Sequence, residues 1–463
     1  MTEEIQKIKV SELPEARSLT GLSALGVDNT NKSVKVGLEF LESAASGHLG
    51  WYGVERDSSI ANSACTRIGK HELHVALPIQ NRMRRCLLRD DGTVRYYLHP
   101  NDSSKTDTGM PADLSGAQGQ VMVEIPEHYC RFETEGTISR VKFSEFPIPG
   151  FHKVQKCYVS AYEASVQRST NKLSSVVNLS ADYRGGGNQS GWDGTFRTQL
   201  GRPATNISLT NFRTYARNRG AAWNCYVYDV HKTVTWLYFV EYANLNCQLK
   251  FNPSLNINGY RQGGLGQGVT NMSNWDLFGY YPVIPCGTTN SLGNKSGVIS
   301  YIVNKNDEGT NQQVLNVPSY RGIENPFGHV WKWMDGCKCR IQADGAGGLS
   351  EFYVCDNPSA FQSDNYDGYV LRGVLPREEG YVKRVMAGEW GDIMPAETGG
   401  SSVTYFSDYY YTSIPGSGES QRGVLVGGDA TYGAIAGLVY ANTHRAPSYA
   451  DATIGSRLCF SPV

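Results

Sequence analysis

The sequence predicts an α+β protein, and three observations support this class. Between residues 50 and 150, apolar and polar residues mostly alternate, as they do in half-buried β-strands. Two helical patterns follow, at residues 209–219 and 229–246. Beyond Cys247, short aromatic segments are separated by glycine-rich stretches. Helices that precede a run of short strands are typical of α+β architecture.

The first fifty residues are expected to form a separate segment. They are fairly polar and contain one candidate helix, residues 32–45, in which apolar residues follow a mixed pattern. A short element of this kind is better suited to packing against another subunit or a partner than to folding alone.

Residues 51–150 are expected to form a compact β domain. Leu73, Val75 and Leu77 alternate with polar residues, the segment 95–98 follows the turn signal Asp91-Gly92, and the segment 121–125 has the composition of a buried strand. On a strand, His71 and His74 point to opposite faces, and their spacing of three differs from the four of zinc-protease helices. We therefore expect no metal site there.

The third region, residues 151–463, contains the helical patterns. Ser208 is a suitable N-cap for a helix from Leu209 to Arg219, and Gly220 is a suitable C-terminal stop. The second helix, from Asp229 to Asn246, carries apolar residues on more than one side and is expected to be largely buried.

Composition excludes several function classes. The 43 Lys and Arg residues balance the 44 Asp and Glu residues, so a basic footprint for nucleic acid or an anionic membrane is absent. The sequence has no apolar run of membrane-spanning length and no apolar secretory signal, so membrane insertion is not expected. Its 11 cysteines include no C-x-x-C pair, and most are expected to be reduced and buried.

Motifs for catalysis are missing from the sequence. It has no dinucleotide-binding G-x-G-x-x-G after a strand, no phosphate-binding loop and no G-x-S-x-G elbow. Cys337 and Cys339 lack the further ligands of a metal site, and His329 is more typical of a core or turn residue than of a ligand. We expect no catalytic residues and no enzyme activity.

The C-terminal end of the chain has the composition of a recognition surface. Between about residues 404 and 459, small or apolar residues such as Val424, Gly427 and Leu438 are interleaved with Tyr, Ser, Asn, Asp and Thr. Tyrosine offers a large and stiff contact area, and short polar residues adapt their hydrogen bonds, which is why binding loops favour both. We therefore predict a displayed ligand-binding surface. Its predicted residues are Phe406, Ser407, Asp408, Tyr409, Tyr410, Tyr411, Thr412, Arg422, Asp429, Thr431, Tyr432, Tyr440, Asn442, Thr443, His444, Arg445, Ser448 and Tyr449.

Four segments of this region, in the same order, resemble a known family. They are the stretch from Arg202 to Gly220, the helix VTWLYFVEYA at 234–243, the segment YRGIENPFGHVWKW at 320–333 and the ending IGSRLC at 454–459. These segments look like the C-type-lectin-type domain of phage and prophage tail receptor-binding proteins, a fold shared with formylglycine-generating enzymes. The resemblance implies two helices and a loop-rich antiparallel sheet over residues 151–463.

The resemblance also carries functional expectations. The leading region, with segments at 8–14, 33–40 and 121–126, is similar to the part of these proteins that fastens them to the tail or baseplate of the virion. Such proteins act as homotrimers on a bacterial surface receptor, either a protein or a glycan. Some are variable proteins of diversity-generating retroelements, in which codons near the end of the gene are rewritten.

Three alternatives remain open on sequence grounds. An oxidase related to formylglycine-generating enzymes needs two reactive cysteines close together near its C-terminal end, where this chain has Cys459. A tail enzyme that degrades polysaccharide needs a pair of carboxylates in a cleft. An ordinary calcium-dependent lectin needs a cage of Asp, Asn and Glu, so calcium is the one possible cofactor, with Asn325-Pro326 and the acidic loop 364–367 as the places that leave room for it.

Overall fold

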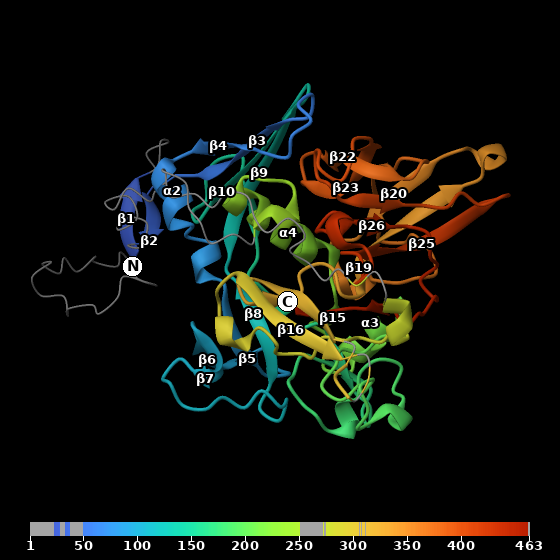
Figure 1. Cartoon of the computed structure of the whole chain (residues 1–463). Helices are drawn as coiled ribbons and strands as arrows, with labels where there is room; N and C mark the ends of the chain where they lie inside the picture. Colours follow the sequence, from blue (N-terminus) through green and yellow to red (C-terminus); the bar gives the residue numbers. More distant parts are fainter. Residues whose placement is uncertain are drawn as a thin grey trace, which may run out of the picture.

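The computed structural model describes residues 23–27, 33–37 and 50–461, apart from 251–271 and positions 273, 274, 305, 307 and 311. In these ranges most of the regular structure is β-sheet, with three α-helices, which agrees with a mixed α+β class. The longest helix, α4 (Tyr228–Tyr242), lies between the N-terminal strands, drawn in blue, and the C-terminal sheet, drawn in orange and red (Figure 1). None of the described helices has the length and apolar character needed to cross a bilayer.

Helix α3 (Leu209–Arg217) confirms the first helical prediction. The Ser208 hydroxyl accepts a hydrogen bond from the backbone N–H of Asn211, as an N-cap should. Leu209, Phe212 and Ala216 form the buried stripe. The helix ends two residues before the predicted Arg219, and Gly220 follows with a positive φ of 151°.

Helix α4 confirms the second helical prediction but ends earlier than expected, at Tyr242 instead of Asn246. Ala243 adopts a left-handed conformation with φ of 48°. The backbone N–H of Cys65 then donates to Ala243 O, and Leu245 N–H donates to Ser63 O. The N-terminal region therefore pairs with the residues that follow the helix, and this pairing replaces the helical bonds.

The predicted strand around Leu73 is wrong, because His71–Ala76 forms the short helix α2. Leu73 and Leu77 are four residues apart and therefore fit a helical face as well as an alternating one. Leu77, in a left-handed conformation before Pro78, closes the helix by donating from its N–H to Leu73 O. His74 is buried, its Nε2 lies 2.9 Å from Ile68 O, and burial lowers its pKa to about 4.

The prediction of a helix at residues 32–45 is also wrong for the residues of this segment that the structure describes. Ser33–Gly37 forms strand β2, which pairs antiparallel with β1 (Ser23–Val27). The apolar residues of this segment lie at alternate positions, Val34 and Val36, so the strand period competes with the helical one. Residues 38–45 lie outside the described ranges.

A five-stranded sheet forms the upper part of the N-terminal region in Figure 1. Its order is β11-β9-β10-β3-β4, and each neighbouring pair is antiparallel. Its strands are β3 (Tyr52–Asp57), β4 (Thr66–Gly69), β9 (His128–Glu135), β10 (Ile138–Ser144) and β11 (His152–Val154).

A seven-stranded sheet of order β15-β28-β12-β8-β5-β6-β7 crosses the boundary expected near residue 150. It combines strands from residues 84–125 with the C-terminal strand β28, which lies between β15 and β12. The predicted strands at 95–98 and 121–125 are confirmed as β6 and β8. The strands are β5 (Arg84–Leu88), β6 (Val94–His99), β7 (Asp102–Thr106), β8 (Gln120–Ile125), β12 (Cys157–Ser160), β15 (Trp223–Cys225) and β28 (Leu458–Phe460).

The C-terminal region is built on a nine-stranded sheet. Its order is β21-β20-β19-β25-β26-β24-β22-β23, and β27 pairs with β19. Its strands are β19 (Trp331–Gln342), β20 (Ser350–Val354), β21 (Val370–Val374), β22 (Gly380–Ala387), β23 (Asp392–Thr398), β24 (Tyr409–Tyr411), β25 (Glu419–Val426), β26 (Ala441–Asn442) and β27 (Ile454–Gly455). Smaller sheets are formed by β13 (Ser165–Gln167) with β14 (Lys172–Ser174), and by β16 (Gly297–Asn304), β17 (Gln312–Tyr320) and β18 (Ile323–Glu324).

All 11 cysteines are free thiols, as predicted, and all except Cys65 are buried. Cys337 and Cys339 lie inside the sheet on β19.

Arg85 on β5 joins the N-terminal strands to the C-terminal half. Its buried guanidinium donates to Gly322 O at 2.7 Å, to Asn290 Oδ1 at 2.7 Å, and to the hydroxyls of Ser103 and Thr289 at 3.0 and 3.2 Å. Buried charge of this kind stabilises a fold only when its hydrogen bonds are complete.

We predict that Arg85→Met lowers the free energy of unfolding by roughly 3–5 kcal/mol, because it leaves several buried acceptors without a donor. Urea denaturation followed by circular dichroism measures this loss. Arg89→Met, at an exposed position four residues along the chain, is the matched control and should change stability by less than about 0.5 kcal/mol. Equal effects of the two substitutions would contradict the role of Arg85.

Candidate ligand-binding surface

The predicted display region begins on a strand of the nine-stranded sheet. Strand β24 runs parallel to β26, with Tyr410 opposite Ala441, and antiparallel to β22, with Tyr409 opposite Tyr381. Strand β25 pairs with both β19 and β26. The tyrosines of β24 are therefore held by a regular hydrogen-bonded frame.

The pleat of β24 sends its three tyrosines to two sides. Tyr410 points inward, is fully buried, and its hydroxyl lies 3.0 Å from the Thr443 hydroxyl. Tyr409 and Tyr411 point to the other face and are half-buried. Successive side chains of a β-strand point to opposite faces of the sheet, so Tyr410 must face away from Tyr409 and Tyr411.

The half-buried tyrosines belong to an aromatic group that we call the tyrosine cluster: Tyr381, Tyr409, Tyr411, Tyr432 and Tyr440. Ring centroids are 5.2 Å apart for Tyr381 and Tyr409, 5.0 Å for Tyr409 and Tyr411, and 5.1 Å for Tyr432 and Tyr440. Tyr440 is buried at the centre and packs at 4.7 Å on Trp331. The outer rings therefore rest on an aromatic base, which limits their rotation.

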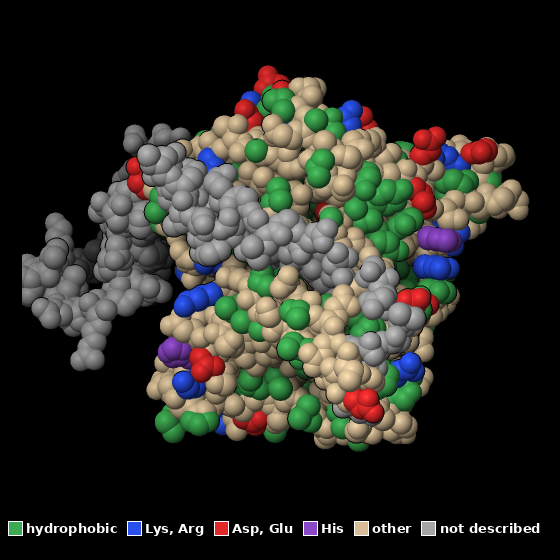
Figure 2. Space-filling model, viewed as in Figure 1, with side chains coloured by type: hydrophobic (Ala, Val, Ile, Leu, Met, Phe, Trp, Pro, Cys, Tyr) green, Lys and Arg blue, Asp and Glu red, His purple; other side chains and the backbone are tan. Residues whose placement is uncertain are grey.

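Figure 2 shows hydrophobic side chains, a class that includes tyrosine in this view, gathered over the region where Figure 1 places β19, β25 and β26. Aromatic side chains are enriched in the surfaces through which proteins bind one another.

A cationic edge borders the tyrosine cluster. The Arg445 guanidinium lies 4.2 Å over the Tyr449 ring, and Arg422 is close enough to Arg445 that the two charges repel. Partial burial, with Arg445 and Arg422 nearby, lowers the pKa of His444. Glu379 interacts electrostatically with both Tyr409 and His444, so the cluster and this edge are adjacent.

Asp429 fixes the turn that presents Thr431 and Tyr432. Its carboxylate accepts hydrogen bonds from Thr431 N–H at 2.9 Å and from the Thr431 hydroxyl at 2.7 Å. Asp429 itself is only 6% exposed. Burial raises its pKa to about 6, although these hydrogen bonds act in the opposite direction.

Asp408 is an internal anchor of the loop that follows β25. Val439 N–H donates to its carboxylate at 2.9 Å, and burial raises its pKa well above the usual value. A Cβ at Gly437 would lie 2.0 Å from Asp408 Oδ1, so only glycine fits there.

Part of the sequence prediction of displayed residues is therefore wrong. The interior holds several of them because they pair strands, accept loop N–H groups or carry the aromatic base. The buried residues are Phe406, Ser407, Asp408, Tyr410, Thr412, Asp429, Tyr440 and Thr443. The binding role of the remaining residues stays a prediction; Thr431 and Ser448 are exposed, and the half-buried ones are Tyr409, Tyr411, Arg422, Tyr432, Asn442, His444, Arg445 and Tyr449.

Sequence reasoning missed Tyr381, Glu379 and Trp331. All three precede the region whose composition drew attention; Trp331 lies in the segment 320–333 that carries the family resemblance, and no local pattern marks Tyr381 or Glu379. The register that places Tyr381 opposite Tyr409 is a property of the folded sheet alone.

The side chains of this surface are of types that can contact a ligand without a covalent step. Aromatic faces, Arg and His donors and a carboxylate can contact a ligand by stacking and hydrogen bonding. Across the described ranges, no group of three or more His, Cys, Asp or Glu side chains is arranged to hold a metal ion. Calcium binding stays a prediction.

No protein-family model and no curated protein matches the sequence. Among solved structures, PvdO from Pseudomonas aeruginosa superimposes with a TM-score of 0.30 at 13% identity, over 74% of this chain and 95% of that chain. The Major Tropism Determinant M1 variant gives a TM-score of 0.23 at 10% identity, over 86% and 88%. The U1 variant gives 0.21 at 10% identity, over 96% of each chain. At these TM-scores the likenesses support no functional inference.

We predict that Asp429→Asn removes a pH-dependent loss of stability. The folded-state pKa of about 6 lies above the usual 3.8, so Asp429 favours folding at pH below about 4 and this contribution is lost as the pH rises through 6. Relative to the unsubstituted protein, the variant should gain roughly 2–3 kcal/mol between pH 4 and pH 7. Urea unfolding at both pH values measures this gain. Asp364→Asn, at an exposed position, is the control; a gain of the same size there would contradict the prediction.

Proposed function

We propose that this chain is a receptor-binding protein of a phage or prophage tail. The observation that carries the proposal is the tyrosine cluster, whose partly exposed rings are fixed on a sheet and bordered by Arg422, His444 and Arg445. Rigid aromatic side chains contribute contact area at low cost in conformational entropy, which suits adhesion. The sequence resemblance to tail proteins supplies the context, a bacterial surface receptor.

In this proposal, residues 151–463 form a C-type-lectin-type domain, and the N-terminal segments attach it to tail or baseplate proteins as a homotrimer. Several linked copies raise avidity by a factor of about 10² to 10⁴ without a new contact, so weak single sites are sufficient. The protein is made in the bacterial cytoplasm and acts on the virion.

The proposal includes diversification of the surface by a retroelement. Exchange at exposed positions usually changes stability by less than about 0.5 kcal/mol, whereas exchange at core positions costs more. Thr431 and Ser448 are exposed, so exchange there should cost little. Tyr409, Tyr411 and Tyr432 are half-buried and lie between the two cases, and exchange of the buried Asp408 or Gly437 should cost most. A near-copy of the 3′ end of the gene beside a reverse transcriptase, differing mainly at adenines of the copy, is the expected genomic sign.

We predict that Tyr411→Ala and Tyr432→Ala each weaken binding of the labelled protein to its host bacteria by about 30-fold or more, the size of a hot-spot loss. Both variants should keep the folded circular dichroism spectrum. Flow cytometry over a protein concentration series measures the affinity.

Leu179→Ala, which truncates another exposed side chain, is the matched control and should bind normally. Unchanged binding by both tyrosine variants would refute the proposed surface. Steady release of oligosaccharide from host capsule would instead assign the chain to the polysaccharide-degrading enzymes.

A further inference from the structure

A cavity of about 480 Å³ lies where the N-terminal strands, helix α4 and the C-terminal sheet meet. Its walls come from β9 and β11, from the first half of α4, from the segment after β20, and from the turn between β22 and β23. A volume of this size suits a small molecule. None of the lining residues belongs to the tyrosine cluster.

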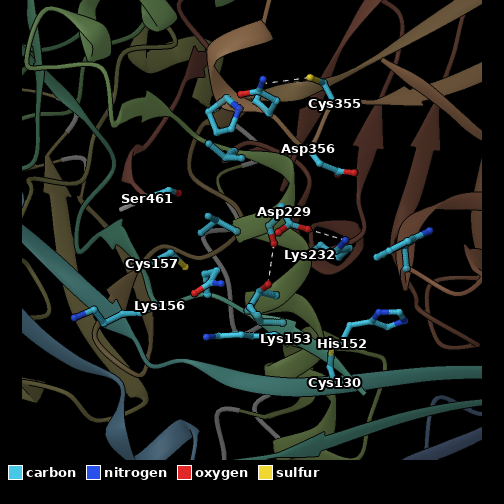
Figure 3. Close-up of a pocket in the computed structure, with 18 of the residues that line it drawn as sticks. Cys130, His152, Lys153, Lys156, Cys157, Asp229, Lys232, Cys355, Asp356 and Ser461 are labelled. Atoms are coloured by element: carbon cyan, nitrogen blue, oxygen red, sulfur yellow. Dashed lines mark hydrogen bonds and ion pairs between the residues drawn. The ribbon is translucent and has the colours of Figure 1, made fainter. Parts of the chain in front are cut away.

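The wall of the cavity combines apolar and charged side chains. Cys130, Cys157, Val230, Trp236 and Phe361 line the inner surface. Figure 3 shows Asp229 and Lys232 of α4 near the middle of the cavity, with Asp356 on one side and Lys153 and His152 on the other. A ligand here meets an apolar wall together with several polar groups.

Most of the charged side chains around the cavity are paired. Asp229 lies 2.7 Å from Lys232, Asp356 lies 2.8 Å from Arg372, and Lys153 lies 2.9 Å from Glu127. Glu389 lies 3.7 Å from His152. At most of these positions an anion or a cation would have to compete with an existing partner, so the site favours a neutral ligand.

Two buried side chains on the cavity wall have polar atoms without a partner in the described part of the chain. Asn224 is 1% exposed, and neither its amide nitrogen nor its carbonyl oxygen is hydrogen-bonded. His128 Nδ1 lies 2.9 Å from Pro126 O, which can only accept, so Nδ1 carries the proton and the unpartnered Nε2 is an acceptor. Burial lowers the pKa of His128 to about 4, which keeps the ring neutral.

Donors and acceptors without partners on the wall of one cavity call for a ligand with groups that both donate and accept, and a hydroxyl is such a group. Trp390, 44% exposed at the cavity, adds an aromatic surface for the apolar face of a ring. We propose that this cavity binds a neutral sugar of one or two rings, as a second ligand site separate from the tyrosine cluster. The proposal goes beyond the adhesive role of that cluster.

The test applies the full-length protein to an array of neutral mono- and disaccharides, and the strongest ligand is then titrated by calorimetry. Ala222→Trp fills the cavity from a half-exposed position, and Asn224→Leu removes the amide at nearly constant shape. Each should weaken sugar binding by at least about tenfold, the loss expected for a blocked site or an unmade hydrogen bond. Ala346→Trp, at an exposed turn, and Tyr411→Ala, on the tyrosine cluster, should bind the sugar within about twofold of the unsubstituted protein.

Three results would overturn the proposal: no neutral sugar bound by the folded protein, binding of charged sugars only, or sugar binding that Tyr411→Ala abolishes while both cavity variants retain it. The last result would place the sugar on the tyrosine cluster and leave the adhesive function standing. Circular dichroism and thermal unfolding of each variant establish that it is folded, and Asn224→Leu keeps the test valid if Ala222→Trp does not fold.

Discussion

The arrangement of the C-terminal half depends on one buried carboxylate, Glu163. His329 donates to it from Nδ1, because its Nε2 already accepts hydrogen bonds from the N–H groups of Val283 and Ile284. Lys332 Nζ lies 2.9 Å from the same carboxylate. Burial alone would raise the pKa of Glu163, but Lys332 and His329 outweigh it and hold the value at about 2. For Lys332 the balance is reversed, because burial outweighs the attraction of Glu163 and lowers the pKa of Lys332 to about 8.

These charges fix the start of β19, from which the rest of the nine-stranded sheet extends. Arg457 joins the same interior: its guanidinium donates to the backbone carbonyls of Ser160, Glu324 and Asn325. Strand β28 follows directly and is enclosed between β15 and β12. The chain between β25 and β28 is therefore anchored at both of its ends. Side chains on the outer face of this region can differ without disturbing the core.

The elements that could be predicted from the sequence are those whose formation depends on residues close together in the chain. An N-cap at Ser208 and a stripe of apolar residues are enough to place α3, and a turn signal at Asp91-Gly92 is enough to place β6. Helix α2 was not predicted because the spacing of Leu73 and Leu77 fits both the helical period and the alternation of a strand. The end of α4 was not predicted because backbone pairing with residues 63–65 determines where the helix stops. The sequence prediction of the candidate surface did not separate inward-facing from outward-facing residues. Burial of Asp408 depends on Gly437 and Val439, whose approach no local pattern reveals.

The pleat of β24 has a consequence for how such a surface can evolve. Tyr409 and Tyr411 face outward while Tyr410 supports the interior, so tolerance to exchange follows a period of two along this strand. A mutational process that rewrites neighbouring codons without regard to this period would lose many of its products to misfolding. Along such a strand, positions that tolerate exchange therefore alternate with positions that do not. The number of variants that still fold is set by backbone geometry as much as by the number of codons that can change.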